Sequence, residues 1–208
     1  MFRDGWRILF ASPSFAVLGG FKYVDKGGMD IEQNKLLQQI LKRMVVQVDS
    51  REKHNKHIIS YFKHKGIKYE KTTLNYGDYT FYVPESKRLK IKRFEAKMVI
   101  ERKGSPEELK TNLFTNDSNR LLAEMTRCHN DGSKMVFLVE SSSSNLFDWI
   151  DRKNIDANEL FNAILAFEKT EFRFQKDFVV EKLKMGSKII ELFKEYLEEY
   201  LKGEVSDG

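Results

Sequence analysis

An acid and two bases stand side by side at Glu101, Arg102 and Lys103, at the end of the apolar run 96–100. Hydrolysis of a phosphodiester at neutral pH needs a carboxylate-held metal, a positioned water and a cation near the developing charge. Glu101 and Lys103 are two residues apart on a predicted strand, so their side chains point to the same face. The three residues predict chemistry on phosphate, with a solvated strand end as the alternative.

A second acid precedes this strand at a spacing that strengthens the prediction. Asp78 lies in the turn "NYGD" and is separated from Glu101 by 22 residues. Magnesium is commonly held by one or two carboxylates together with the substrate phosphate. The pattern follows the spacing logic of restriction-type nucleases, in which two acids take the metal and the lysine orients or polarises the water. A third acid, Asp49, ends another apolar strand in "VDSRE" (48–52), with Arg51 and Glu52 behind it. Like charges converge only at a cost unless a cation or a role requires them.

These motifs resemble a known family. In order and approximate spacing, "VDSRE" (48–52), "GDY" (77–79) and "IERK" (100–103) are similar to the nuclease domain of XPF-type structure-specific DNA endonucleases. The resemblance extends over about residues 44–165. It implies a restriction-endonuclease-like core and magnesium-dependent cleavage of branched or flapped DNA, with Mn²⁺ able to substitute.

The resemblance also implies roles for individual residues. Metal ligands are expected at Asp49, Asp78 and Glu101, and Lys103 is expected to support the attacking water. Arg102 belongs to the family's catalytic set, although strand alternation points it away from its neighbours unless the strand bulges there.

Three nearby residues are expected to play secondary parts, namely Arg51, Glu52 and Glu107. The family signature is ERK, three residues, then Asp, and Glu107 stands where that Asp is expected. It keeps the negative charge on a side chain one methylene longer. No paired helix-hairpin-helix module follows in this sequence, so the grip on duplex DNA must come from elsewhere.

The elements that must position these residues follow from the hydrophobic pattern. Helices are predicted at 30–44, 54–66, 118–132, 156–172 and 186–203, and another begins after Ser105. Strands are predicted at 44–48, 67–74, 79–83, 96–103, 134–140 and 177–180, with 67–74 and 79–83 joined as a hairpin. Strands alternating with helices predict an α/β domain, and the hairpin makes its central sheet mixed, flanked by helices.

Composition and length limit the alternatives. The chain has 208 residues, a formal net charge of +5 and a pI of about 9.1, which permits a polyanionic partner without demanding one. A single cysteine, Cys128, excludes an intrachain disulfide and a thiolate zinc site, in keeping with a reducing cytoplasm. We expect a cytoplasmic protein, associated with the nucleoid if its source is a bacterium or a virus.

Residues 1–28 are predicted to be a weakly ordered extension or the product of a misplaced start codon. Their apolar stretch is short, mixed with polar residues and interrupted by Pro13, so we expect neither a secretory signal nor a membrane anchor. Residues 29–43 form a leading helix, and residues 44–208 form the nuclease domain with its C-terminal helices.

A basic segment lies between the GDY and ERK motifs. Residues 85–97 concentrate positive charge, and we expect them to contact DNA phosphates next to the metal site, against the alternative of a solvated hairpin face. The predicted DNA-binding residues are Lys87, Arg88, Lys90, Lys92 and Arg93.

Together these patterns predict a magnesium-dependent DNA endonuclease acting on structured DNA, in DNA repair, in recombination or in a mobile element. The alternatives are a junction resolvase or nickase on the same fold and a non-catalytic DNA-binding scaffold. A wide apolar arc on 186–203 leaves two interpretations open, which are packing on its own domain and a homodimer interface.

Overall fold

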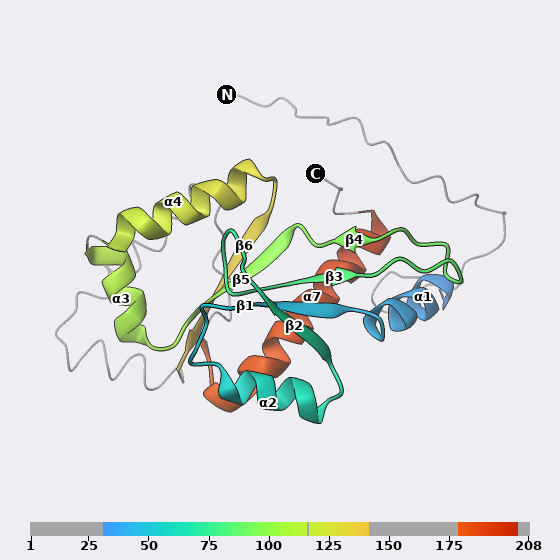
Figure 1. Cartoon of the computed structure of the whole chain (residues 1–208), viewed down its shortest axis with the longest axis horizontal. Helices are drawn as coiled ribbons and strands as arrows, with labels where there is room; N and C mark the ends of the chain where they lie inside the picture. Colours follow the sequence, from blue (N-terminus) through green and yellow to red (C-terminus); the bar gives the residue numbers. More distant parts are fainter. Residues whose placement is uncertain (1–30, 116, 142–178, 204–208) are drawn as a thin grey trace, which may run out of the picture.

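The computed structural model describes residues 31–115, 117–141 and 179–203 (Figure 1). A mixed β-sheet forms its centre, with strand order β2-β1-β3-β5-β6-β7 and with β4 paired to β3. The elements are α1 (Ile31–Leu41), β1 (Val45–Asp49), α2 (Lys56–His64), β2 (Lys68–Thr72), β3 (Tyr79–Val83), β4 (Phe94–Glu95), β5 (Met98–Lys103), α3 (Pro106–Phe114), α4 (Asp117–Asn130), β6 (Lys134–Glu140), β7 (Val179–Val180), a 3-10 turn (Lys182–Lys184) and α7 (Met185–Lys202).

The predicted α/β class with a mixed central sheet flanked by helices is confirmed. Each predicted element within the described residues is present, with ends shifted by a few residues. The predicted helix 156–172 and the extension 1–28 lie outside the described residues. Strand β4 was not predicted, because two residues carry too little pattern. Among the described residues, no helix has both the length and the apolar character to cross a membrane.

The predicted hairpin between 67–74 and 79–83 is wrong. Strand β1 lies between the two, paired parallel with β2 and antiparallel with β3. Burial explains this order. β1 is buried at Val46 and Val48, whereas no residue of β2 is buried. The sheet therefore keeps β1 inside and β2 at the edge, and α2 makes the crossover between these parallel strands.

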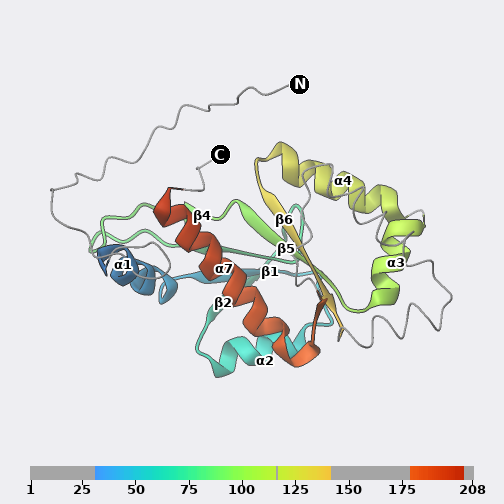
Figure 2. The same ribbon diagram turned by 180° about the vertical axis from the view of Figure 1, so that it is seen from behind.

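One face of the sheet packs on the main core. Val46, Val48, Phe81, Ile100 and Leu138 point into it, and α1, α2 and α7 close it from the other side. Figure 2 shows α7 running across this face. Seven α7 residues are buried. Phe193 packs on Phe81 with the two ring centres 4.8 Å apart and the rings tilted. The apolar arc of α7 thus packs on its own domain.

The opposite face is covered only in part. Three β6 side chains point away from the main core, namely Met135, Phe137 and Val139. They are buried together with Leu121 and Met125 of α4. Over β1, β2 and β3 the same face presents polar side chains instead, including Gln47, Thr72 and Thr80, none of them buried. This half-covered face carries the predicted acids.

Candidate active site

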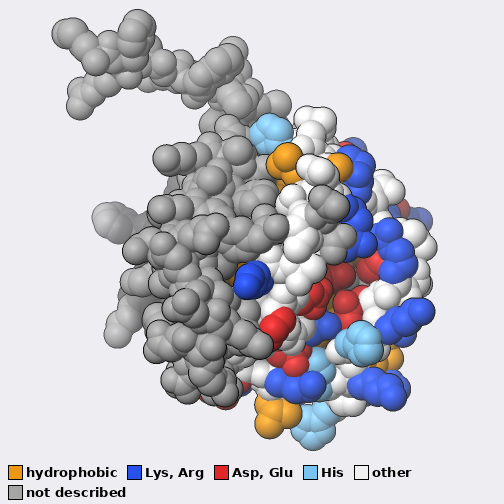
Figure 3. Space-filling view, turned by 90° about the vertical axis from the view of Figure 1, so that its left-hand side faces the viewer, with side chains coloured by type: hydrophobic (Ala, Val, Ile, Leu, Met, Phe, Trp, Pro, Cys, Tyr) orange, Lys and Arg blue, Asp and Glu red, His pale blue; other side chains and the backbone are white. Residues whose placement is uncertain are grey.

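The predicted acids meet at one end of the sheet, where the inner strands β1, β3 and β5 begin or stop. Asp49 is the last residue of β1, Asp78 directly precedes β3, and Glu101 lies near the end of β5. The Asp49 N–H donates to the Asp78 carbonyl, and the Asp78 N–H donates to the Ile100 carbonyl, both at 2.8 Å. Because side chains alternate along strands, the carboxylates of all three acids share a face. Figure 3 views this end and shows acidic side chains gathered in a hollow with Lys and Arg side chains around it.

Asp78 and Glu101 are two nearby carboxylates whose negative charges repel each other. Burial raises the pKa of Asp78 well above its ordinary value, and the nearby Glu101 raises it further. Burial also raises the pKa of Glu101, against the opposing effect of Lys103. Asp78 accepts the Arg102 N–H at Oδ2 (2.7 Å), and Glu101 accepts Lys103 at Oε1 (2.6 Å). In the described part of the chain their second oxygens have no hydrogen bond. A buried and a half-buried carboxylate that repel each other and keep free oxygens fit a divalent cation.

Lys103 is held in place from two sides. Its Nζ donates to Glu101 Oε1 and to Asn112 Oδ1 of α3, each at 2.6 Å, and the residue is 3% exposed. A buried ammonium group fixed beside a carboxylate can orient a water or stabilise a developing charge. Asn112 was not among the predicted site residues, because nothing in the sequence indicates that α3 folds back onto β5.

Asp49 has a different environment from the other two acids. Its carboxylate accepts the Arg51 N–H (2.7 Å), the Arg51 guanidinium and the Leu74 N–H (3.2 Å). Burial acts to raise the pKa of Asp49, but these hydrogen bonds outweigh it and lower the pKa. Within residues 31–115, 117–141 and 179–203, no three acidic, His or Cys side chains form a cluster that could hold a metal ion. A metal role for Asp49 therefore requires Arg51 to move aside, and it stays a prediction.

Arg102 points to the face opposite Glu101 and Lys103. The pairing of β5 with β6 is unbroken from Met98 to Lys103, so no bulge turns the arginine toward the acids. Its Nη1 lies 2.6 Å from Glu140 Oε2, and its Nη2 lies 3.0 Å from Glu52 Oε1. His57 Nε2 approaches the same Glu140 oxygen at 3.2 Å. Arg102 thus reaches Asp78 through its backbone N–H, while its side chain anchors Glu52.

Glu124 of α4 is a further site residue that was not predicted from the sequence. Its Oε1 accepts the Gly77 N–H at 2.8 Å, which fixes the turn that presents Asp78. Gly77 has φ +69°, and a Cβ there would collide with Val99, so the turn requires glycine. Glu124 also lies near enough to Glu101 to raise its pKa further. Only the approach of α4 to this loop reveals the contact.

Glu107, predicted in a secondary part, is exposed in the first turn of α3. The next residue, Glu108, turns back instead and accepts the Gly104 N–H at 2.7 Å, while Ser105 caps the helix by accepting the Glu108 N–H. These two hydrogen bonds fix the direction in which α3 leaves the ERK strand.

The basic segment lies at the other end of the sheet. Its five predicted DNA-binding residues are all exposed, in the connection between β3 and β4. The full length of β3, about 16 Å for five residues, separates this connection from Asp78. The expected proximity to the metal site is therefore wrong, because the order β1-β3-β5 places the start of β3, and not its end, beside Glu101. DNA contact by this segment stays a prediction.

Comparison with known proteins identifies the family. The family model of the ERCC4 domain matches residues 48–184, well over half of the chain. The chain belongs to the ERCC4 domain family. All three motifs noted above lie within the ERCC4 match, and the expected XPF-type nuclease domain is thereby confirmed.

Among solved structures, the chain is similar to XPF from Aeropyrum pernix, with 19% identity and a TM-score of 0.49. The similarity covers 72% of this chain and 60% of that one, so the ERCC4 chain described here spans less than two thirds of that structure. No curated protein matches the chain.

Proposed function

We propose that this chain is a divalent-metal-dependent endonuclease that hydrolyses phosphodiester bonds in branched or flapped DNA. Membership of the ERCC4 family supports a nuclease. The observation that carries the metal dependence is the pair of half-buried Asp78 and buried Glu101 beside Lys103, with the pKa of both carboxyls raised. Magnesium is the expected ion, and Mn²⁺ is expected to replace it, because both accept carboxylate oxygens.

Each residue of the site has a part in this chemistry. Asp78 and Glu101 would hold the metal, which supplies Lewis-acid activation of water and phosphate when bound. Lys103 orients the attacking water or stabilises charge developing on the phosphate, and Asn112 keeps its ammonium group aimed at Glu101. Asp49 is proposed as a further ligand once Arg51 turns from it toward a DNA phosphate.

The test is cleavage of matched flap, fork, four-way junction and linear duplex DNAs, with and without Mg²⁺. We expect cleavage of branched substrates only with metal, and little of the linear duplex. Symmetric cuts in the four-way junction would favour a resolvase, and single-strand cuts in linear duplex a nickase. Binding without cleavage under all conditions would favour a scaffold.

Substitution of the two carboxylates tests the site. Asp78→Ala and Glu101→Ala should each abolish cleavage while leaving DNA affinity within a few-fold, because binding rests on cationic contacts. Glu107→Ala, which removes an exposed carboxylate on α3, is the matched control and should cleave more than either. Wild-type rates in Asp78→Ala or Glu101→Ala would overturn the assignment.

A further inference from the structure

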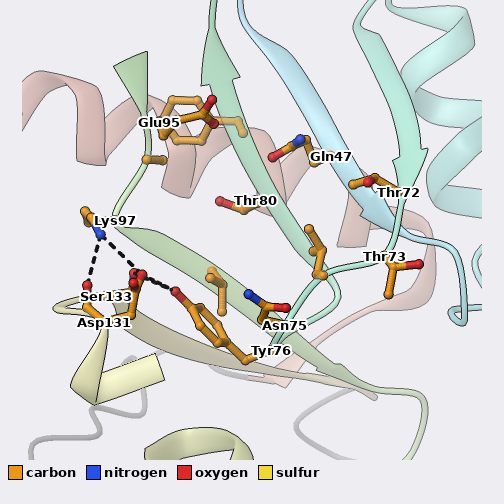
Figure 4. Close-up of a pocket in the computed structure, with 14 residues that line it drawn as sticks. Gln47, Thr72, Thr73, Asn75, Tyr76, Thr80, Glu95, Lys97, Asp131 and Ser133 are labelled. Carbon is orange, nitrogen blue, oxygen red and sulfur yellow. Dashed lines mark hydrogen bonds and ion pairs between the residues drawn. The ribbon is translucent and has the colours of Figure 1, made fainter. Parts of the chain in front are cut away.

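A polar groove of about 320 Å³ opens on the uncovered part of the sheet (Figure 4). Its floor comes from β1, β3 and β5, and its walls from the end of β2, the loop 73–76 and the turn 131–133. Of the lining residues, only 95–97 belong to the basic segment 85–97 that was expected to contact DNA phosphates. Its volume lies at the lower end of the range for small-ligand sites.

The groove lies on the same face of the sheet as the candidate active site and next to it along the strands. Gln47 of β1, Thr80 of β3 and Val99 of β5 line it. Each is two residues along its strand from Asp49, Asp78 or Glu101, so each side chain points to the same face as its acid. Two strand residues span about 7 Å, which is close to the rise of two stacked nucleotides in one DNA strand.

Charge makes the groove unsuited to phosphate. The charged side chains in its lining are Glu95, Lys97 and Asp131, a net charge of −1. The one cation among them, Lys97, already pairs with Asp131 at 3.2 Å. Glu95 pairs in turn with Arg93, so the charged side chains of the lining offer a phosphate group no unpaired cation.

The neutral side chains suit a flat, uncharged group that forms hydrogen bonds. In the described part of the chain, the Asn75 side-chain amide has no hydrogen bond, and Gln47 uses only its Nε2, on Glu70. Side-chain amides match the donor and acceptor edges of nucleobases. Figure 4 shows Asn75 and Tyr76 side by side at the groove, with Gln47 across from them.

Tyr76 supplies a fixed aromatic ring. Its hydroxyl donates to Asp131 and is hydrogen-bonded to Ser133 at 3.0 Å, which limits rotation of the side chain. Burial and the bond to Asp131 raise the pKa of Tyr76 to about 12, so the ring stays uncharged at neutral pH. Aromatic rings held in this way serve as stacking surfaces for unpaired bases.

We propose that this groove binds one unpaired nucleobase of the DNA strand whose phosphate lies at Asp78 and Glu101. The inference rests on the proposed nuclease function and deepens it. A base in an intact duplex is stacked and paired and reaches the groove only at the cost of unpairing. The groove therefore gives the domain its own preference for substrates with an unpaired nucleotide next to the cut.

An abasic scan tests the proposal by activity. Each unpaired nucleotide near the branch of a fork is replaced in turn by an abasic analogue, and kcat/KM is measured with the full chain. We expect one position at which loss of the base slows wild-type cleavage about tenfold. The variant Gln47→Ala/Asn75→Ala should cleave the intact fork about tenfold more slowly, with no further loss at that position. Gln38→Ala, which removes an exposed amide on α1, is the control and should keep the position dependence. Cleavage by the wild type with no sensitive position overturns the proposal.

A binding measurement separates this inference from the proposed nuclease function. 2-Aminopurine placed at the same positions reports base unstacking by fluorescence when the full chain binds in EDTA, where no cleavage occurs. A fluorescence change at one position, absent with Gln47→Ala/Asn75→Ala of unchanged melting temperature, supports the groove even if the chain cleaves no DNA. An equal change for wild type and variant, or none in either, overturns it.

Discussion

At the scale of single residues, the ERK motif divides between two faces of one strand. Glu101 and Lys103 share the face of Asp49 and Asp78. Arg102 points to the opposite face, where it contacts Glu52 in the loop before α2 and Glu140 at the end of β6. All three residues of the motif are buried. The arginine therefore differs from its neighbours in what it can do, and its contribution to catalysis is expected to be indirect.

Replacement of Arg102 tests this division. Arg102→Met leaves Glu140 and Glu52 without their shared cation, and breaking such a buried pair costs about 3–5 kcal/mol. We expect the free energy of unfolding in urea to fall by that amount. Lys103→Met removes the other buried cation of the motif and should abolish cleavage even in the fraction that stays folded. Wild-type stability of Arg102→Met would contradict an anchoring role.

Glu124 offers a second test at this scale. Glu124→Ala removes the acceptor for the Gly77 N–H, whereas Glu124→Gln keeps an oxygen in its place. If Glu124 positions Asp78, Glu124→Ala should raise the Mg²⁺ concentration needed for half-maximal cleavage about tenfold, the lower end of the range for residues behind metal ligands.

The conservative variant supplies the control for Glu124. Glu124→Gln should stay near the wild-type metal requirement. Equal losses in both variants would instead assign the effect to the charge of Glu124, and no loss in either would remove it from the site.

At the scale of elements, strand order sets the distance between the basic β3–β4 connection and the candidate active site. The connection between β3 and β4 leaves the sheet at the end of β3 opposite Asp78, so its cations cannot touch the phosphate being cleaved. They can contact DNA farther along an arm of the substrate. Such a contact raises affinity without discriminating sequence.

This separation predicts a particular effect of neutralisation. Replacing Lys87, Arg88 and Lys92 by Gln should weaken DNA binding and flatten the slope of log affinity against log salt by roughly 0.9 per lost phosphate contact. At saturating DNA the cleavage rate should hold, because these side chains lie far from the acids. The same loss of charge from Lys63, Lys65 and Lys68, also exposed, is the control. An unchanged slope would return the segment to a solvated face.

At the scale of the whole molecule, α7 bears on assembly. Its apolar arc, which left a homodimer open as an interpretation of the sequence, is buried against the sheet and α2 of its own chain. The arc by itself therefore gives the free chain no reason to pair. A homodimer remains a proposal that depends on DNA bringing two copies together.

Light scattering at micromolar concentration measures the mass of the chain alone and with DNA, and so the number of copies in each complex. We expect a mass near 24.5 kDa for the free chain and two chains per DNA when a branched substrate is added. One chain per DNA at saturation would exclude the homodimer. A dimer without DNA would place the interface outside the buried arc of α7.

The sequence by itself determined what depends on local pattern. Alternation and helical spacing predicted the strands that carry Asp49 and Glu101, and the cap at Ser105 marked the start of α3. The motif residues and their order led to the family that the comparison confirmed. These features depend on neighbours in the chain, so the pattern alone contains them.

Only the tertiary structure decided which distant segments meet. Strand β1 separates β2 from β3 because its buried Val46 and Val48 place it inside the sheet, where neighbouring strands pair its backbone on both edges. No local signal distinguishes that order from a hairpin. The same holds for Asn112 on Lys103, where α3 folds back onto the strand just before it, and for Glu124 on Gly77, where α4 meets a turn 47 residues earlier. Those contacts form when whole faces of helices and sheet are buried together. Apolar burial is the main favourable term in the free energy of folding, and the spacing of residues along the chain does not reveal which faces meet.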